Sequence, residues 1–89
     1  MVFNSKHKPV VELFGLPDPP TRGRARLVHV AIELFYSHGL QAMGIDRILN
    51  AAGVTKTTFY KHFDSKGDLL VAAIRQRDEW EMQAWTAAV

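Results

Sequence analysis

Apolar residues recur at spacings of three and four along most of this 89-residue chain, which is the pattern of helices that bury one face. The first such stripe consists of Leu27, Val28, Ala31, Leu34 and Phe35. Thr21 precedes it and has the hydroxyl of a helix cap, and Gly39 follows it, where a left-handed residue suits a helix end. The pattern predicts a first helix over residues 22–38.

A shorter stripe follows, made of Ile45, Ile48, Leu49 and Ala52. Asp46 lies in its first turn, where negative charge suits the helix dipole, and Gly53 follows at the position that stops a helix. Thr55 is the predicted cap of a third helix. In that helix Phe59 and Phe63 are four residues apart, so both are expected to face the core. Two short helices joined by a tight turn are therefore predicted.

A fourth helix is predicted to start at Ser65, its cap, and to run to the end of the chain, because no Gly or Pro follows Gly67. Its apolar side consists of Leu69, Leu70, Ala73 and Ile74. Further along lie Trp80, Met82 and Trp85, an apolar surface too large to leave in water. We expect this surface to pack against a C-terminal domain beyond the chain or against a dimer mate. A ligand-pocket role for Trp85 is the alternative.

The first twenty residues differ from the rest because prolines interrupt any helix, at Pro9, Pro17, Pro19 and Pro20. The apolar island of residues 10–14 can dock on the body or on a partner, but we expect the segment to be mobile. The chain is thus predicted to be all-α. It divides into a mobile tail (1–20), a three-helix domain (21–64) and a connecting helix (65–89).

The turn between the second and third helices, from Ala52 to Thr55, is typical of a helix-turn-helix. Gly53 permits the left-handed residue, and Val54 can fill the corner between the helices. In DNA-binding versions the second helix enters the major groove with its N-terminal residues against the bases. A generic helical corner shares this pattern, so the exposed residues decide between the two interpretations.

The exposed residues of the third helix suit DNA. Its first turn contains Lys56, Thr57 and Thr58, which are predicted base contacts because lysine and threonine can hydrogen-bond base edges. Tyr60 can place its hydroxyl on a phosphate, and Lys61 lies beside it. Lys66 begins the fourth helix, where backbone N–H groups favour an anion. Any one of these lysines alone is ordinarily a solvated side chain, and their shared location favours DNA.

Three arginines lie at the front of the first helix, at positions 22, 24 and 26. Positive charge there opposes the helix dipole, so its placement fits an anionic partner. The side chains can reach the DNA backbone or an adjacent minor groove, and we predict phosphate contacts for Arg24 and Arg26. A chance basic stretch is the alternative explanation.

Two stretches resemble the TetR family of bacterial transcriptional regulators. Residues 24–39 resemble the first helix of that family, and residues 45–70 look like the helices that follow. The most specific matches are Ala52–Lys56, Phe59–Tyr60, His62–Phe63, Ser65–Lys66 and Leu69–Leu70. They fall at fixed offsets across three helices, and the resemblance covers roughly residues 22–85.

The resemblance implies a homeodomain-like helix-turn-helix that binds a palindromic, double-stranded DNA operator as a homodimer. Tyr60 and Lys66 match the positions that hold phosphates in the family, and His62 is a further predicted phosphate contact. The base-reading positions match Lys56, Thr57 and Thr58. The resemblance also implies a ligand-responsive repressor, in which a separate C-terminal domain binds a small-molecule inducer, shifts the fourth helix and releases the operator.

The chain departs from the family at two places. Met43-Gly44 stands where Ser or Thr usually precedes the second helix, so the cap is a glycine, weaker by about a few tenths of a kcal/mol. A possible hydroxyl contact to phosphate is lost with it. Thr57 stands where a smaller residue is common, which alters the expected base preference. The operator sequence therefore cannot be copied from a relative.

Charge and composition narrow the class of protein. Residues 1–67 contain nine Lys and Arg against five Asp and Glu, whereas residues 68–89 contain two against four. The basic part is the part that can meet phosphate, with an unevenly charged surface as the alternative. The chain contains no cysteine, which indicates a reducing compartment, and no apolar run long enough for a membrane span. We therefore predict a cytoplasmic protein that binds no membrane.

No constellation of catalytic residues, metal-ligand spacing or phosphate-binding loop occurs in the sequence. We predict no enzyme activity, no cofactor and no metal. His29 and His38 are expected on the surface or at a boundary of the first helix. The alternative function is a helical protein-interaction module, in which the aromatic fourth helix and the apolar tail bind a partner.

Overall fold

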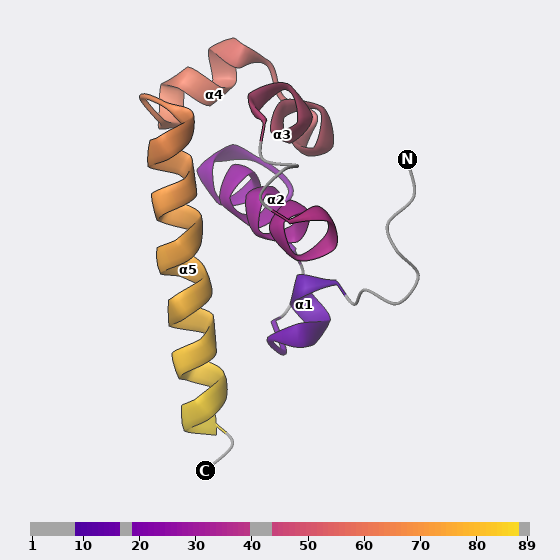
Figure 1. Cartoon of the computed structure of the whole chain (residues 1–89), viewed down its shortest axis with the longest axis vertical. Helices are drawn as coiled ribbons and strands as arrows, with labels where there is room; N and C mark the ends of the chain where they lie inside the picture. The colour runs from indigo at the N-terminus through magenta and orange to yellow at the C-terminus, as the bar shows by residue number, and fades with distance from the viewer. Residues whose placement is uncertain (1–8, 17–18, 40–43, 88–89) are drawn as a thin grey trace.

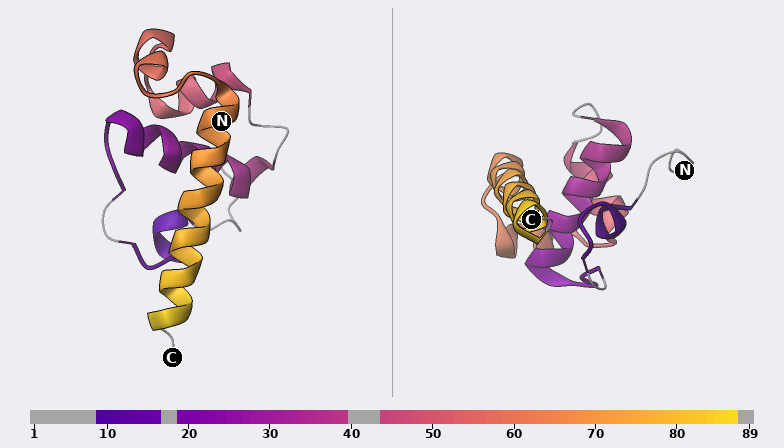
Figure 2. Two further views of the ribbon diagram at one scale, coloured as in Figure 1. Left: turned by 90° about the vertical axis from the view of Figure 1, so that its left-hand side faces the viewer. Right: turned by 90° about the horizontal axis from the view of Figure 1, so that it is seen from below.

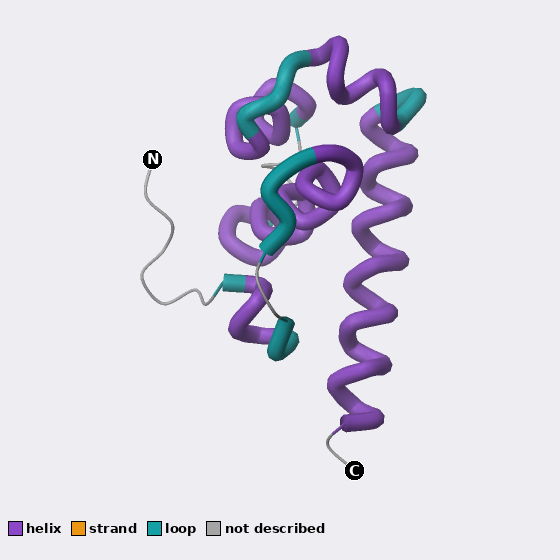
Figure 3. Tube along the Cα trace, turned by 180° about the vertical axis from the view of Figure 1, so that it is seen from behind, coloured by secondary structure: helices purple, strands orange, loops and turns teal. Residues whose placement is uncertain are grey.

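The computed structural model describes residues 9–16, 19–39 and 44–87, which form helices and loops with no strand among them (Figures 1 and 3). The helices in chain order are α1 (Val10–Leu13), α2 (Gly23–His38), α3 (Ile45–Ala52), α4 (Lys56–His62) and α5 (Lys66–Ala87). The predicted all-α class is confirmed. Met43 lies outside the described residues, and Gly44 is the N-cap of α3 without a capping side chain.

The central helix is α2. Figure 1 shows α5 along one side of it, α3 and α4 at one end of the molecule, and α1 on the side of α2 away from α3. The turned views in Figure 2 show that α5 crosses α2, so the far half of α5 projects beyond the three-helix head. None of the helices in the described residues is both long and apolar enough to cross a bilayer.

The core surrounds α2 more completely than its apolar stripe predicts. Every residue from Leu27 to Ile32 is buried, including Val30 and Ile32, which lie off the stripe. The reason is that α2 contacts α3, α4, α5 and α1, so several faces are covered at once. Phe35, which the stripe places inside, is 38% exposed because it borders an open groove.

His29 is also buried, which corrects its predicted place at the surface. Its ring is 5% exposed and meets the edge of Trp80 with the ring centroids 5.9 Å apart. Nε2 lies 3.8 Å from a carboxylate oxygen of Glu33, and Nδ1 has no hydrogen-bond partner. Burial is the main cause that lowers the pKa of His29. The charge of Glu33 opposes this shift, and the charge of Arg26 adds to it. The neutral ring is therefore the favoured form in the folded protein.

The start of α2 differs from the expected one. The helix begins at Gly23, and Arg22 occupies the N-cap with an extended backbone and no capping hydrogen bond from its side chain. The predicted cap at Thr21 is wrong because Thr21 lies one residue outside the cap position.

The N-terminal segment docks on the body over residues 9–16. Phe14 packs against Tyr36 of α2 and Trp80 of α5, with ring centroids 6.1 and 5.5 Å apart. Leu16 also packs against the core. Docking was the alternative to a mobile tail, and it is the arrangement found for these residues; residues 1–8 and 17–18 lie outside the described ones.

The same contacts cover part of Trp80, one of the three residues of the predicted apolar surface of α5. Its ring is half-buried against Phe14 and His29 of its own chain, so part of this tryptophan is covered within the described residues. Met82 and Trp85 remain 69% and 75% exposed. The predicted apolar surface of α5 is thus reduced to these two side chains.

Candidate nucleic-acid interface

The turn between α3 and α4 has the geometry expected of it. Gly53 adopts the left-handed conformation, with φ 70° and ψ 32°. Its N–H donates to the carbonyl oxygen of Asn50 at 3.2 Å, and the N–H of Val54 donates to that of Leu49 at 3.1 Å. These are the two bonds of a Schellman motif, which satisfies the last carbonyls of α3. Because Val54 also packs against the core, the turn fixes how α4 leaves α3.

Thr55 caps α4, as the sequence predicts. Its hydroxyl oxygen accepts a hydrogen bond from the N–H of Thr58 at 3.2 Å. The same hydroxyl donates to that of Thr58 at 3.3 Å, and Thr58 is half-buried. The Thr58 hydroxyl therefore accepts a bond within the cap and keeps its own O–H as a hydrogen-bond donor.

The two sides of α4 differ sharply. Phe59 is fully buried and Phe63 is 6% exposed, with their ring centroids 5.8 Å apart. On the other side Lys56, Thr57 and Lys61 are exposed. Tyr60 lies between them: its ring packs edge-on against Phe59 at 5.0 Å, while the residue stays 52% exposed. A buried aromatic face thus holds α4, which lies at one end of the molecule (Figure 1), and the exposed face of the helix is polar.

The start of α5 lies close behind α4. The hydroxyl of Ser65 accepts from the N–H of Asp68 at 3.2 Å, so the predicted cap is confirmed. Lys66 is the first residue of the helix and is exposed, next to N–H groups that have no partner within the helix. Lys61 and His62 are the basic residues of the last turn of α4. The predicted phosphate contacts on α4 and α5 therefore border one end of the head.

The two arginines predicted to contact phosphate, Arg24 and Arg26, lie in different surroundings. Arg24 stacks its guanidinium over the ring of Phe63, 5.1 Å from the centroid, and lines the same open cleft of about 540 Å³ as His62. Arg26 instead donates to the carbonyl oxygen of Ala51 at the end of α3, at 3.4 Å. Arg24 therefore joins the α4 group, whereas Arg26 braces α3 against α2.

Arg47 is a residue that sequence reasoning did not select. It is exposed on α3, the first helix of the helix-turn-helix, which crosses the DNA backbone in DNA-binding versions of this motif. The signal was available, because position 47 falls between the apolar positions 45 and 48 and so lies off the buried stripe. Arg47 is therefore a further candidate for phosphate contact.

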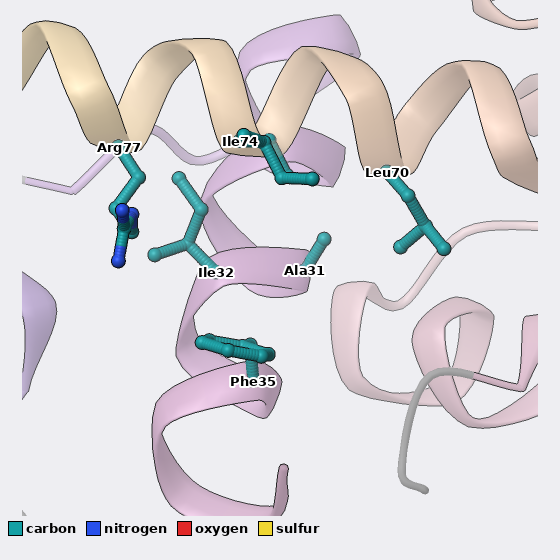
Figure 4. Close-up of a pocket in the computed structure, with 7 residues that line it drawn as sticks. Ala31, Ile32, Phe35, Leu70, Ile74 and Arg77 are labelled. Carbon is teal, nitrogen blue, oxygen red and sulfur yellow. The ribbon is translucent and has the colours of Figure 1, made fainter. Parts of the chain in front are cut away.

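A second surface lies away from this interface, between α2 and α5. Figure 4 shows an open groove of about 400 Å³ in which Phe35 of α2 faces Leu70 and Ile74 of α5. The lining is apolar apart from Arg77 at one end. Hydrogen bonds to Asp78, foremost, and to Tyr36 raise the pKa of Arg77. Within the described part of the chain, His, Asp and Glu side chains form no cluster of three that could hold a metal ion.

Comparison with known proteins identifies the family of the chain. Residues 27–73 match the family described as bacterial regulatory proteins, tetR family. The chain is similar to the transcriptional activator FasR of Mycolicibacterium smegmatis (38% identity, covering 65% of the chain and 26% of the relative). It is also similar to the transcriptional regulator AcuR of Cereibacter sphaeroides, with 33% identity over 74% of the chain and 35% of the relative. The Tn10 TetC protein of Escherichia coli is 47% identical over 57% of the chain and 26% of the relative.

These relatives are considerably longer, since the chain spans about a quarter to a third of their length. No solved structure matches the chain. The family consists of regulatory proteins, which agrees with the prediction that this is not an enzyme. The matched residues include all of α3 and α4 and the turn between them. The chain therefore belongs to the tetR family of bacterial regulatory proteins, and its helix-turn-helix is the DNA-binding domain of that family.

Proposed function

We propose that this chain is the operator-reading part of a ligand-responsive repressor and that it inserts the N-terminal end of α4 into the major groove. The observation that carries this proposal is the division of α4 into a buried face, held by Phe59 and Phe63, and an exposed polar face. A helix braced in this way can enter a groove without exposing the core. Its first turn is the part that meets base edges in helix-turn-helix proteins.

Base reading falls to three residues in this proposal. Lys56 and Thr57 are exposed and can hydrogen-bond base edges, with guanine the preferred partner of the lysine. Thr58 offers its methyl group to a thymine methyl, and its hydroxyl, which accepts a bond from Thr55, can still donate to a base edge. This arrangement supports a short sequence-specific contact in each half-site.

Phosphate contacts hold the head in register. We assign these to Tyr60, Lys61, His62 and Lys66, with Arg24 beside them and Arg47 on α3. Arg26 was predicted in the same role. Its hydrogen bond to Ala51 favours a structural role unless DNA draws the side chain away.

Dimerisation, a palindromic operator, an inducer and a cytoplasmic location belong to the same proposal. They are supported by family membership and by the greater length of the relatives, which leaves room for a second domain. The direction of regulation varies among relatives: FasR is named an activator, and KstR2 of Mycolicibacterium smegmatis is named a repressor. Repression is the direction proposed here, and a reporter gene placed behind the selected operator tests it.

The experiment starts from a pool of random DNA duplexes, because neither the sequence nor the structure specifies the operator. Binding and amplification should enrich one short motif, whose affinity is then measured at several salt concentrations. Lys66→Ala should weaken binding to all duplexes and reduce the slope of log affinity against log salt by about one. Arg77→Ala is the control, since Arg77 lies about 16 Å further along α5 and lines the separate groove between α2 and α5.

The variant Thr58→Ala should change the enriched motif at one position while leaving the salt slope unchanged. Equal loss of affinity for every duplex with both Lys66→Ala and Thr58→Ala would contradict the assigned roles. Failure of the chain to enrich any motif would contradict sequence-specific binding itself.

The rival function is a protein-interaction module, favoured by the apolar groove between α2 and α5. The docked position of Phe14 weakens the version in which the apolar tail binds a partner, because the tail is already occupied. The two functions differ in one measurement. Ile74 lines the groove and is 59% exposed. Ile74→Ser therefore alters the groove, and it should leave motif enrichment intact if DNA reading is the function.

A further inference from the structure

The connecting helix α5 is held to the head over only part of its length. Leu69 and Ala73 are buried, and Leu70 and Ala72 pack against the core. Arg77 then hydrogen-bonds Tyr36 of α2. The next hydrophobic residue packed against the core is Trp80, about 10 Å beyond Ala73, and residues 82–86 are all exposed. Trp80 is therefore the outermost point at which α5 is packed against the rest of the described chain.

The N-terminal segment supplies one side of that contact. Phe14 bridges two helices, since its ring meets Tyr36 of α2 at 6.1 Å and Trp80 of α5 at 5.5 Å. His29 of α2 meets the same tryptophan at 5.9 Å. Removing Phe14 would leave Trp80 with the contact to His29 but without the bridge across α2 and α5.

The segment has its own internal structure, which presents Phe14. The N–H groups of Glu12 and Leu13 both donate to the carbonyl oxygen of Pro9 at 3.0 Å, and that of Leu16 donates to Val11 at 2.8 Å. Gly15, with φ 62°, allows the chain to turn back after α1. The aromatic ring is thus carried on a closed loop rather than on an extended tail.

We propose that residues 9–16 form a strap that sets the direction in which α5 leaves the head, with Phe14 as its positioning residue. The inference rests on the proposed function of a ligand-responsive repressor, in which the family resemblance implies that an inducer-binding domain acts on the DNA-binding head by shifting α5. The strap connects the N-terminal segment to both α2 and α5, and it therefore opposes rotation of α5 away from α2. A variant without the ring should let the far half of α5 take several orientations.

The test measures the direction of α5 without DNA. The chain contains no cysteine, so spin labels can be attached at Asn50→Cys on α3 and Gln83→Cys on α5, both exposed positions. Double electron–electron resonance then gives the distribution of distances between the labels. The parent should give one narrow peak, whereas Phe14→Ala should shift or broaden it. The matched control is Leu13→Ala, which removes a neighbouring side chain that is 45% exposed.

Two further variants separate positioning from folding. Phe14→Tyr keeps the ring and should restore the narrow peak. Gly15→Val strains the turn of the strap without removing any aromatic contact, because the added Cβ meets no atom within 4 Å and its cost is conformational. This variant should broaden the distribution of distances between the labels while the far-UV circular dichroism signal of the helices is retained. If Phe14→Ala loses helix content, the Gly15→Val result tests the strap in its place.

A Phe14→Ala distribution that coincides with that of Leu13→Ala, in a folded protein, would overturn the strap. So would a narrow peak in a folded Gly15→Val variant. Neither result depends on binding to an operator, so failure of the strap and failure of the proposed function are read from different experiments.

Discussion

The Gly53→Ala substitution tests the geometry on which the DNA-binding head depends. Gly53 lies in the left-handed region, where an L-residue costs about 1–2 kcal/mol. A Cβ at this position meets no atom within 4 Å, so no steric clash adds to that cost. Alanine recovers about 0.4–1 kcal/mol by restricting the unfolded chain. The net expectation is a destabilisation of about 1 kcal/mol, or a fall in Tm of about 4–8 °C for a domain of this size.

Urea unfolding followed by circular dichroism at 222 nm measures the change in the free energy of unfolding. Gly53→Asn should cost less than alanine, because asparagine tolerates the left-handed region better. D-Alanine at position 53, introduced by chemical synthesis, is the sharpest control: it has the same atoms but favours positive φ, so it should stabilise the fold. Equal stability of the L- and D-alanine proteins would refute the assignment of the cost to backbone conformation.

Three other predictions follow from the same structure. Phe59→Ala should destabilise the protein by about 3–5 kcal/mol, because it leaves a cavity at a fully buried site beneath α4. Urea unfolding should then show that little or none of the protein is folded without denaturant. Thr55→Ala should cost about 1 kcal/mol through loss of the α4 cap, whereas Thr55→Ser should restore most of it in the same assay. Burial lowers the pKa of His29 below that of the unfolded chain, so the unfolded state binds more protons, and stability should fall as the pH drops from about 6.5 towards the lower folded-state pKa. His29→Gln should flatten this dependence in unfolding experiments at several pH values, and an unchanged pH profile would contradict the buried neutral ring.

Local signals in the sequence were sufficient for the helix-turn-helix. Gly53, Thr55 and Ser65 act through bonds to residues at most four positions away, so their roles can be predicted without knowing the fold. The inward face of α4 also followed from the spacing of Phe59 and Phe63. The exposed residues of α4 then followed by exclusion.

The features that escaped prediction depend on contacts between distant parts of the chain. Phe14 meets Trp80 across 66 positions, and no local pattern specifies that pairing. His29 is buried because α2 is covered on several sides, whereas an amphipathic stripe accounts for only one. The position of Arg24 over Phe63 likewise requires α2 and α4 to be packed together.

The shortness of α4 has a consequence for how binding specificity can change. Seven residues form barely two turns, and a helix of that length is marginal in water by itself. Its order is supplied by the aromatic side chains beneath it and by the cap before it, not by the residues that point outward. Substitutions at positions 56 and 57, whose side chains are exposed, are therefore nearly free of folding constraints. New operators can be acquired by exchanging those side chains while the scaffold stays the same.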